Sequence, residues 1–281
     1  MLKVEYLEKI PKWWNERKYY DLVLSNDIDS FMTCEVLKQV KGWDINYFYT
    51  FDSMGLTDSV TSNEYIGVDI SFNQEMKCFD NHVVMLNEHD YCNSKSINFN
   101  VADKISRINY FNKYCGSTLL MVWSLYGLPL PESEEGKMIL LAIDSTFKGF
   151  YSPYLNDKTS NKHYLDAMGF YELYEVLKRH KQTDFIKLIR KYNLSSNIEV
   201  KKGYLKTDID LEELRKVFDL PFLLPEKKFY CLQEYENKTV SLNADCMDIS
   251  KDDICESIYS IALTKRNFLN YSVLKGDSVM N

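Results

Sequence analysis

Two short apolar runs of this chain are each followed directly by aspartates. The run "DLVLS" (21–25) precedes Asp27 and Asp29, and the run "EYIGV" (64–68) precedes Asp69. Carboxylates that gather at one place repel one another unless a cation neutralises them. Hard divalent cations bind oxygen ligands, and two of them about 3.5–4 Å apart can activate water and hold a phosphoryl group. The pattern therefore favours two-metal phosphoryl chemistry.

Two further aspartates stand in similar positions. Asp80 lies in "CFDNHVV", two residues before His82, and Asp144 ends a helix predicted over 133–143. A single aspartate at such a place is usually a helix cap or a turn residue. Because the pattern recurs at the ends of several elements, one common site explains it better than separate caps.

Strands and helices alternate over the first 150 residues. This alternation predicts an α/β fold whose N-terminal domain has a doubly wound, mainly parallel sheet. Ligands of such sheets bind outside the carboxyl ends of the strands, where Asp27, Asp29 and Asp69 are expected. The predicted strands are 21–25, 45–51, 64–71 and 82–86, and the predicted helices are 30–41, 117–128 and 133–143.

The pattern changes after residue 150. Residues 162–193 predict a long amphipathic helix with a break near Gln182 and Thr183. Beyond it, "IEVKKGYLK", "KFYCLQEY" and "KTVSLNA" predict strands, and 250–268 begins like a helix capped by Ser250. We expect a metal-binding catalytic domain (1–155), a helical connector (156–194) and a smaller mixed α+β domain for substrate or partner (195–281).

Composition narrows the class of protein. The 281 residues are 45% apolar and carry a net charge of −7, so a sizeable core is expected and extended binding to duplex DNA is disfavoured. No apolar run is long enough to cross a membrane, and the N-terminus lacks the apolar block of a signal peptide, so we expect a cytoplasmic protein without membrane contact. The seven cysteines contain no C-x-x-C pair and are expected to be reduced.

Several motifs, taken in chain order, resemble those of the DHH phosphoesterase family. This family includes RecJ-like exonucleases, nanoRNases, cyclic dinucleotide phosphodiesterases and family II pyrophosphatases. Its motifs are H-x-D-x-D-[GS] after the first strand, an aspartate that ends a later strand, D-H-H, a small-residue stretch opening a helix, and a helix running into D-[TS]-x-x-F. The corresponding segments here are "SNDIDS", "GVDIS", "DNH", "CGSTLLMVWSLYGL" and "LLAIDSTFKGF".

The resemblance implies a site for two ions, Mn²⁺ or Mg²⁺. Asp27 and Asp69 would hold the first ion. Asp29, Asp69 and Asp144 would hold the second, so that Asp69 bridges both. Together with Asp69, His82 and Asp80 would serve catalysis, His82 by contacting the scissile phosphate and Asp80 by orienting its neighbours.

The chain departs from the family at both metal-binding histidines. Ser25 or Asn26 replaces the first, and Asn81 replaces the second, where it would supply an oxygen ligand. One interpretation is an active site that prefers Mg²⁺ or Mn²⁺ to metals that favour imidazole. The other is a domain that has lost metal affinity and binds without cutting.

The second departure concerns the C-terminal part, which lacks the family's glycine-rich G-G-G-H loop. Lys265 and Arg266 are candidate phosphate ligands, and Asn267 is a candidate for contact with a base or sugar. The alternative is that these three residues form a solvated helix end.

Three functions remain open. The first is a metal-dependent phosphodiester hydrolase for single-stranded nucleic acid, short oligonucleotides or a signalling nucleotide. The second is a weakened or inactive DHH-fold protein that binds nucleic acid, a nucleotide or a protein partner. The third is a pyrophosphatase-like enzyme for small phosphates.

Overall fold

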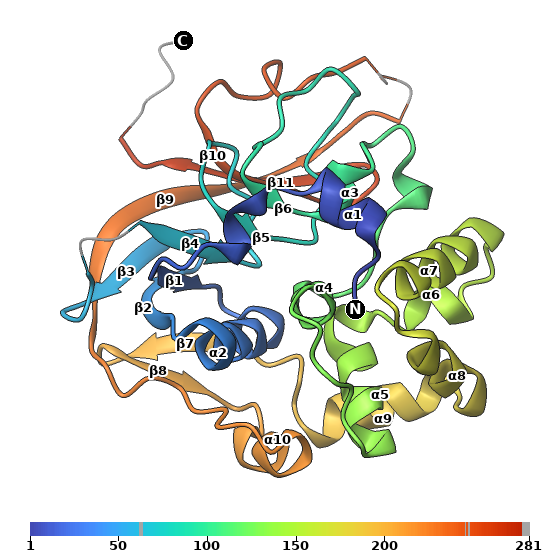
Figure 1. Ribbon diagram of the computed structural model, residues 1–281. Coiled ribbons are helices and arrows are strands. Elements are labelled where there is room, and N and C mark those ends of the chain that lie inside the picture. Colours follow the sequence, from blue (N-terminus) through green and yellow to red (C-terminus); the bar gives the residue numbers. More distant parts are fainter. Residues whose placement is uncertain (62–63, 245, 247, 277–281) are drawn as a thin grey trace.

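A mixed nine-stranded sheet forms the centre of the computed structural model, which describes residues 1–61, 64–244, 246 and 248–276 (Figure 1). Its strand order is β10-β11-β9-β3-β2-β1-β4-β5-β6. Five neighbouring strands are parallel: β2 (Asp44–Tyr49), β1 (Asp21–Leu24), β4 (Tyr65–Val68), β5 (Cys78–Phe79) and β6 (Ser96–Ile97). The other four strands extend the sheet beyond β2, each antiparallel to its neighbour: β3 (Ser53–Thr57), β9 (Phe229–Ser241), β11 (Phe268–Leu274) and β10 (Ile258–Lys265). The predicted α/β class is confirmed.

Helices pack against the parallel half of the sheet, and two further strands form a separate hairpin. The hairpin pairs β7 (Ile198–Lys201) with β8 (Tyr204–Thr207). The α-helices are α1 (Val4–Lys9), α2 (Ile28–Lys41), α3 (Phe99–Ala102), α4 (Thr118–Leu125), α5 (Glu134–Ala142), α6 (Lys148–Tyr151), α7 (Leu155–Ala167), α8 (Tyr171–Arg179), α9 (Gln182–Lys191) and α10 (Leu211–Phe218). The 3₁₀ turns are η1 (Lys12–Asn15), η2 (Tyr110–Asn112) and η3 (Ile143–Ser145).

Strand β1 is buried on both faces. Successive side chains of a strand point to opposite sides of the sheet, so neighbouring residues of β1 join different clusters. Leu22 and Leu24 join the large apolar cluster of the helices. Val23 joins a second cluster that contains Tyr235 of β9 and Tyr259 of β10. The C-terminal strands therefore help to cover the face of β1 opposite its main helical cluster.

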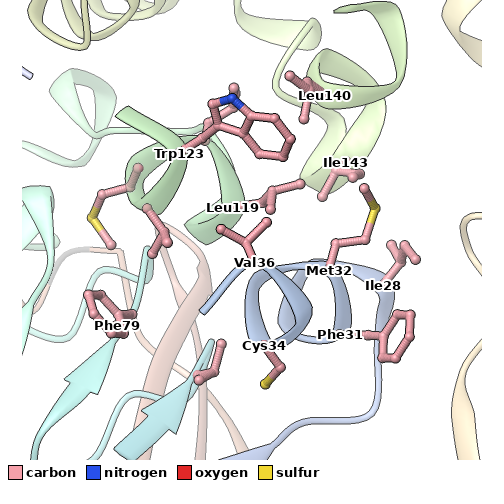
Figure 2. Close-up of a cluster of buried hydrophobic side chains, with 14 of the residues drawn as sticks. Ile28, Phe31, Met32, Cys34, Val36, Phe79, Leu119, Trp123, Leu140 and Ile143 are labelled. Carbon is pink, nitrogen blue, oxygen red and sulfur yellow. The ribbon is translucent and has the colours of Figure 1, made fainter. Parts of the chain in front are cut away.

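The main core lies between α2, α4 and the end of α5. Figure 2 shows Leu119 of α4 beside Val36 of α2, with Met32 and Ile143 close by. All four side chains are almost fully buried. This packing fixes the N-terminal ends of α2 and α4 relative to each other, and both helix ends belong to the site described below.

The sheet curls until its last strand returns to the parallel half. On β10, Ile261 N donates to Ser71 O at 3.0 Å, and Leu263 N donates to Val83 O at 2.9 Å. Asn73 N donates to Tyr259 O at 2.8 Å. Strand β10 thus lies along the segments that follow β4 and β5, so residues from the C-terminal part lie next to the carboxyl ends of the parallel strands.

Several sequence predictions of local structure are confirmed and others are wrong. The helices predicted at 30–41, 117–128 and 133–143 correspond to α2, α4 and α5, but the helix predicted over 250–268 does not form. Ser250 and Asp253 do make a reciprocal capping contact. Strand β10 follows it, because the β-branched and aromatic side chains after it pair with β11 and the loop after β4.

Two other predicted segments also differ. In the segment 162–193, the break predicted near Gln182 and Thr183 is confirmed, since α8 ends before the extended His180 and α9 begins at Gln182. A second break was not predicted: Gly169 adopts a left-handed φ of 75° and separates α7 from α8. The strand predicted over 82–86 is only extended chain, with one bridge from Met85 to Ser106. Among the described residues, none of the helices has the length and apolar character needed to span a bilayer.

Candidate metal centre

The carboxyl ends of β1 and β4 define the site. The chain leaves β1 toward β2 on one side, and β4 pairs with β1 on the other, so this edge is the switch point where open α/β sheets bind ligands. Asp27 caps α2 here, and its Oδ1 accepts a hydrogen bond from Ser30 N at 3.0 Å. Asp69 directly follows β4.

Asp29 is buried in the first turn of α2, where it contacts the start of α4. Its Oδ2 accepts from Thr118 N at 2.7 Å, and its Oδ1 accepts from Leu119 N at 2.8 Å. Free N–H groups at a helix N-terminus stabilise a negative charge. Thr118 also donates its hydroxyl to Asp69 Oδ1 at 2.8 Å. The start of α4 therefore holds Asp29 and Asp69 in place. The sequence had marked this segment only as a small-residue stretch that opens a helix.

Asp144 reaches the site from the end of α5. Asp144 and Ser145 have left-handed φ values of 52° and 56°, and Asp69 has a φ of 59°. Such conformations are costly for residues with a Cβ atom, and they cluster at functional sites. Asn81 donates its Nδ2 to Asp144 Oδ2 at 2.5 Å and to Gly116 O at 2.9 Å. Asn81 thus connects Asp144 to the loop before α4.

The predicted acidic residues come together as two overlapping groups. Carboxylate oxygens of Asp29, Asp69 and Asp144 lie within 4.8 Å of one another. Ligand atoms of Asp69, Asp80 and His82 also lie within 4.8 Å of one another. Asp69 belongs to both groups, but the second group holds Asp80 and His82 where Asp27 was expected, and Asp27 belongs to neither of these groups of described residues. The all-carboxylate group suits a hard divalent cation.

Burial and mutual repulsion destabilise the charged forms of these carboxylates. Burial first, and then the charge of Asp144, raise the pKa of Asp27 to about 6. Burial and the neighbouring aspartates raise the pKa values of Asp29 and Asp69 well above the ordinary value. Carboxylates with raised pKa values gain the most from a cation that neutralises them.

Asp80 fixes the ring of His82. Burial alone would lower the pKa of His82, but the charge and hydrogen bond of Asp80, with Asp69 and Asp144, raise that pKa to about 10. Asp80 Oδ1 lies 2.8 Å from His82 Nδ1, and its Oδ2 accepts from Asn98 Nδ2 at 2.6 Å. With Nδ1 bonded to Asp80, Nε2 is the ring nitrogen left for a ligand. Asn98 carries no sequence signal beyond its position as the N-cap of α3.

A cavity of about 220 Å³ adjoins the acidic residues. Asp27, Asp69 and His82 line one part of it, and residues of β9, β10 and β11 line another. A second cavity of about 220 Å³ lies beside Asp27 and Asp144, and residues 194–196 close its other side. Asp27 borders both cavities.

The three residues predicted to bind substrate lie at the hairpin between β10 and β11. Asn267 Oδ1 accepts from Arg107 Nε at 3.1 Å, and Arg266 Nε donates to Arg107 O at 3.3 Å. Lys265 lies over the ring of Phe268. None of Lys265, Arg266 and Asn267 lines the cavity beside the acidic residues, whereas their neighbour Thr264 does. Their role in substrate binding stays a prediction.

Comparison with models of protein families, with curated proteins and with solved structures found no match to this chain.

Proposed function

We propose that this protein is a divalent-metal-dependent phosphodiester hydrolase of the DHH type. Its substrates would be single-stranded nucleic acid, short oligonucleotides or a signalling nucleotide. One observation carries the proposal: Asp29, Asp69 and Asp144, from three separate segments, place carboxylate oxygens within 4.8 Å of one another beside a cavity. Asp29 and Asp69 are buried, whereas Asp144 is exposed, and buried carboxylates this close together are costly without a cation.

The proposal assigns a role to each residue of the site. Asp27, Asp29, Asp69 and Asp144 would hold Mn²⁺ or Mg²⁺, two ions if the enzyme is active, and Asp69 would be shared between them. When bound, such ions neutralise the phosphoryl group and make water a better nucleophile. The remaining role belongs to His82, whose Nε2 donates to a phosphate oxygen while Asp80 holds Nδ1.

The proposal also assigns a function to each part of the chain. Residues 1–155 would form the doubly wound catalytic domain, 156–194 the connector, and 195–281 the smaller domain that contacts substrate. The curl of the sheet supports the last role, since β10 is hydrogen-bonded to the loop that follows Asp69.

A specific observation favours the alternative of a weakened or inactive enzyme that binds a nucleotide, a nucleic acid or a protein. Both oxygens of Asp29 already accept backbone N–H groups. Asn81 was expected to supply an oxygen ligand, but it presents its Nδ2 to Asp144. Asp29 Oδ1 also accepts from Thr33 Oγ1 at 3.5 Å, whereas Asp29 Oδ2 retains a second lone pair. The donor set therefore still fits a cation, but with fewer free ligand sites.

The test is hydrolysis of end-labelled single-stranded DNA, RNA and a dinucleotide with Mn²⁺ or Mg²⁺. Asp69→Asn is the informative variant, because asparagine tolerates the left-handed conformation at this position. We expect cleavage by the natural chain and a loss of at least about 100-fold in the variant, the scale seen when electrostatic stabilisation is removed. Asp166→Asn, an exposed aspartate paired with Lys3, is the control and should cleave normally.

Two outcomes would favour the alternative. No cleavage of any substrate, together with no Mn²⁺ binding by calorimetry, would remove the enzyme from consideration. Cleavage that appears only after Asn81→His would show a natural site weakened at that position.

A further inference from the structure

The cavity beside the acidic residues has a second side that the proposed metal chemistry does not use. This side comes from the loop between β2 and β3 and from strands β9, β10 and β11. Phe51, Asn237 and Asn270 contribute an aromatic ring and two side-chain amides, and Ser260 and Thr264 contribute hydroxyls. An aromatic ring with a few polar groups is the usual lining of a small-molecule site.

The amides on this side keep hydrogen-bonding capacity for a ligand. Asn270 Oδ1 accepts from Thr239 Oγ1 at 2.9 Å, which fixes the orientation of the amide. Within the described part of the chain, neither N–H of the Asn270 amide has a hydrogen-bond partner. Ser260 is held in place by hydrogen bonds to Tyr49 and Ser272, both at 2.8 Å. This side of the cavity is therefore already ordered without a ligand.

Backbone conformation supports a built position for Phe51. This residue has a φ of 67°, which is rare for a residue with an aromatic side chain. Its ring centroid lies 5.0 Å from that of Tyr49, which is fully buried. Residues held in such conformations concentrate at ligand sites.

Charge and size limit what this side of the cavity can accept. Of the described residues that line the cavity, none is a lysine or arginine. A second phosphate would therefore lie near Asp27 and Asp69 with no cationic side chain other than His82, which the proposed mechanism already assigns to the first phosphate. The volume of about 220 Å³ lies below the roughly 300–1,000 Å³ of sites that enclose a drug-sized ligand. One uncharged ring system fits these limits.

We propose that Phe51, Asn237, Asn270 and Thr264 form a subsite for a single uncharged nucleobase, next to the phosphate held at the acidic residues. The inference rests on the proposed function and narrows its substrate class. A phosphodiester with a base on at least one side is accepted, whereas pyrophosphate and polyphosphate are not. Asparagine amides pair with the donor and acceptor edges of bases, and Phe51 supplies a stacking surface.

The experiment measures binding of nucleosides to the full chain in EDTA, so that it does not depend on a metal. Adenosine, guanosine, cytidine, uridine and thymidine are titrated separately by calorimetry, with ribose and pyrophosphate as probes that lack a base. We expect at least one nucleoside to bind and ribose and pyrophosphate not to bind. Asn270→Leu should weaken the nucleoside about ten-fold, the effect of losing one or two hydrogen bonds.

A matched control and a second variant keep the result interpretable. Gln233→Leu makes a similar change on β9 at a residue that does not line the cavity, and it should bind normally. If Asn270→Leu does not fold by circular dichroism, Thr264→Val, at an exposed position, replaces it. Absence of nucleoside binding, ribose binding as tightly as the nucleosides, or equal affinity in a folded Asn270→Leu or Thr264→Val variant would overturn the subsite.

The two proposals fail in distinguishable ways. If nucleosides bind in EDTA but no substrate is cleaved, the subsite stands and the hydrolase does not. If a dinucleotide is cleaved, with loss in Asp69→Asn but no change in Asn270→Leu or Thr264→Val, the hydrolase stands and the base subsite does not.

Discussion

Glu35 makes the stability of this protein depend on pH in a way that can be measured directly. It lies in the middle of α2 and is only 3% exposed. Burial, which outweighs the opposing charge of Lys38, raises the pKa of its carboxyl from 4.5 to about 7. The neutral acid is therefore favoured in the folded protein, while the unfolded chain ionises at lower pH.

The sign and size of the effect follow from proton linkage. Between pH 4.5 and 7 the unfolded chain has released this proton and the folded chain has kept it, so the free energy of unfolding falls as pH rises. The loss is complete above pH 7 and amounts to about 3 kcal/mol, since each tenfold change in a proton equilibrium corresponds to 1.36 kcal/mol. Glu35→Gln removes this contribution because the amide does not ionise.

The assay is urea unfolding of both proteins at pH 5, 6, 7 and 8. Relative to the natural chain, we expect Glu35→Gln to gain about 2–3 kcal/mol of stability between pH 5 and pH 8. The carboxylates of the metal site also make stability depend on pH, but they do so equally in both proteins. Their contribution therefore cancels when Glu35→Gln is compared with the natural chain. Glu88→Gln, at a side chain 80% exposed, controls for the loss of one charge. A difference between Glu35→Gln and the natural chain that does not change with pH would refute the reasoning.

Four further outcomes are expected. Adding 1 mM Mn²⁺ should raise the melting temperature of the natural chain but not of Asp69→Asn, because a ligand that binds only the folded state stabilises it; equal shifts would argue against the site. Thr118→Val, which removes the hydroxyl donated to Asp69, should weaken Mn²⁺ affinity about 10-fold in calorimetry, as loss of an outer-shell contact does; an unchanged affinity would contradict this role. Ser71→Ala should leave thermal stability unchanged or raise it, since Ser71 Oγ is buried and has no hydrogen-bond partner among the described residues; a large loss would mean that the hydroxyl has one. Leu119→Ala should cost about 3 kcal/mol in urea unfolding through the cavity it leaves; a cost below about 1 kcal/mol would mean that the core around α4 rearranges.

The parallel half of the fold could be predicted because its signals are local. The apolar run of β1 and the capping serine before α5 each act within a few residues. The carboxyl ends of adjacent parallel strands meet at one edge, so local patterns were enough to predict that Asp27 and Asp69 are neighbours. The expected proximity of the site residues followed from topology alone.

The wall of the cavity formed by β9, β10 and β11 could not be predicted, and the reason is physical. The hydrogen bonds from β10 to Ser71 and Val83 join segments that are distant in sequence, and no local pattern records which distant edge a strand will pair with. The capping contact at Ser250 even favoured a helix at this point. Asn237 and Asn270 gave no signal as single asparagines, and only the curl of the sheet places them on the cavity.

The return of β10 to the loop after β4 also has a consequence for how the protein folds. Contacts between segments far apart in sequence form slowly, because the chain between them must lose its freedom before the contact is made. The carboxylates at the ends of β1 and β4 can assemble with α2 and α4 from residues 20–145. The opposite wall of the cavity is complete only after residues 258–274 have joined the sheet. Until these strands have joined the sheet, the acidic residues lack the wall that β9, β10 and β11 supply.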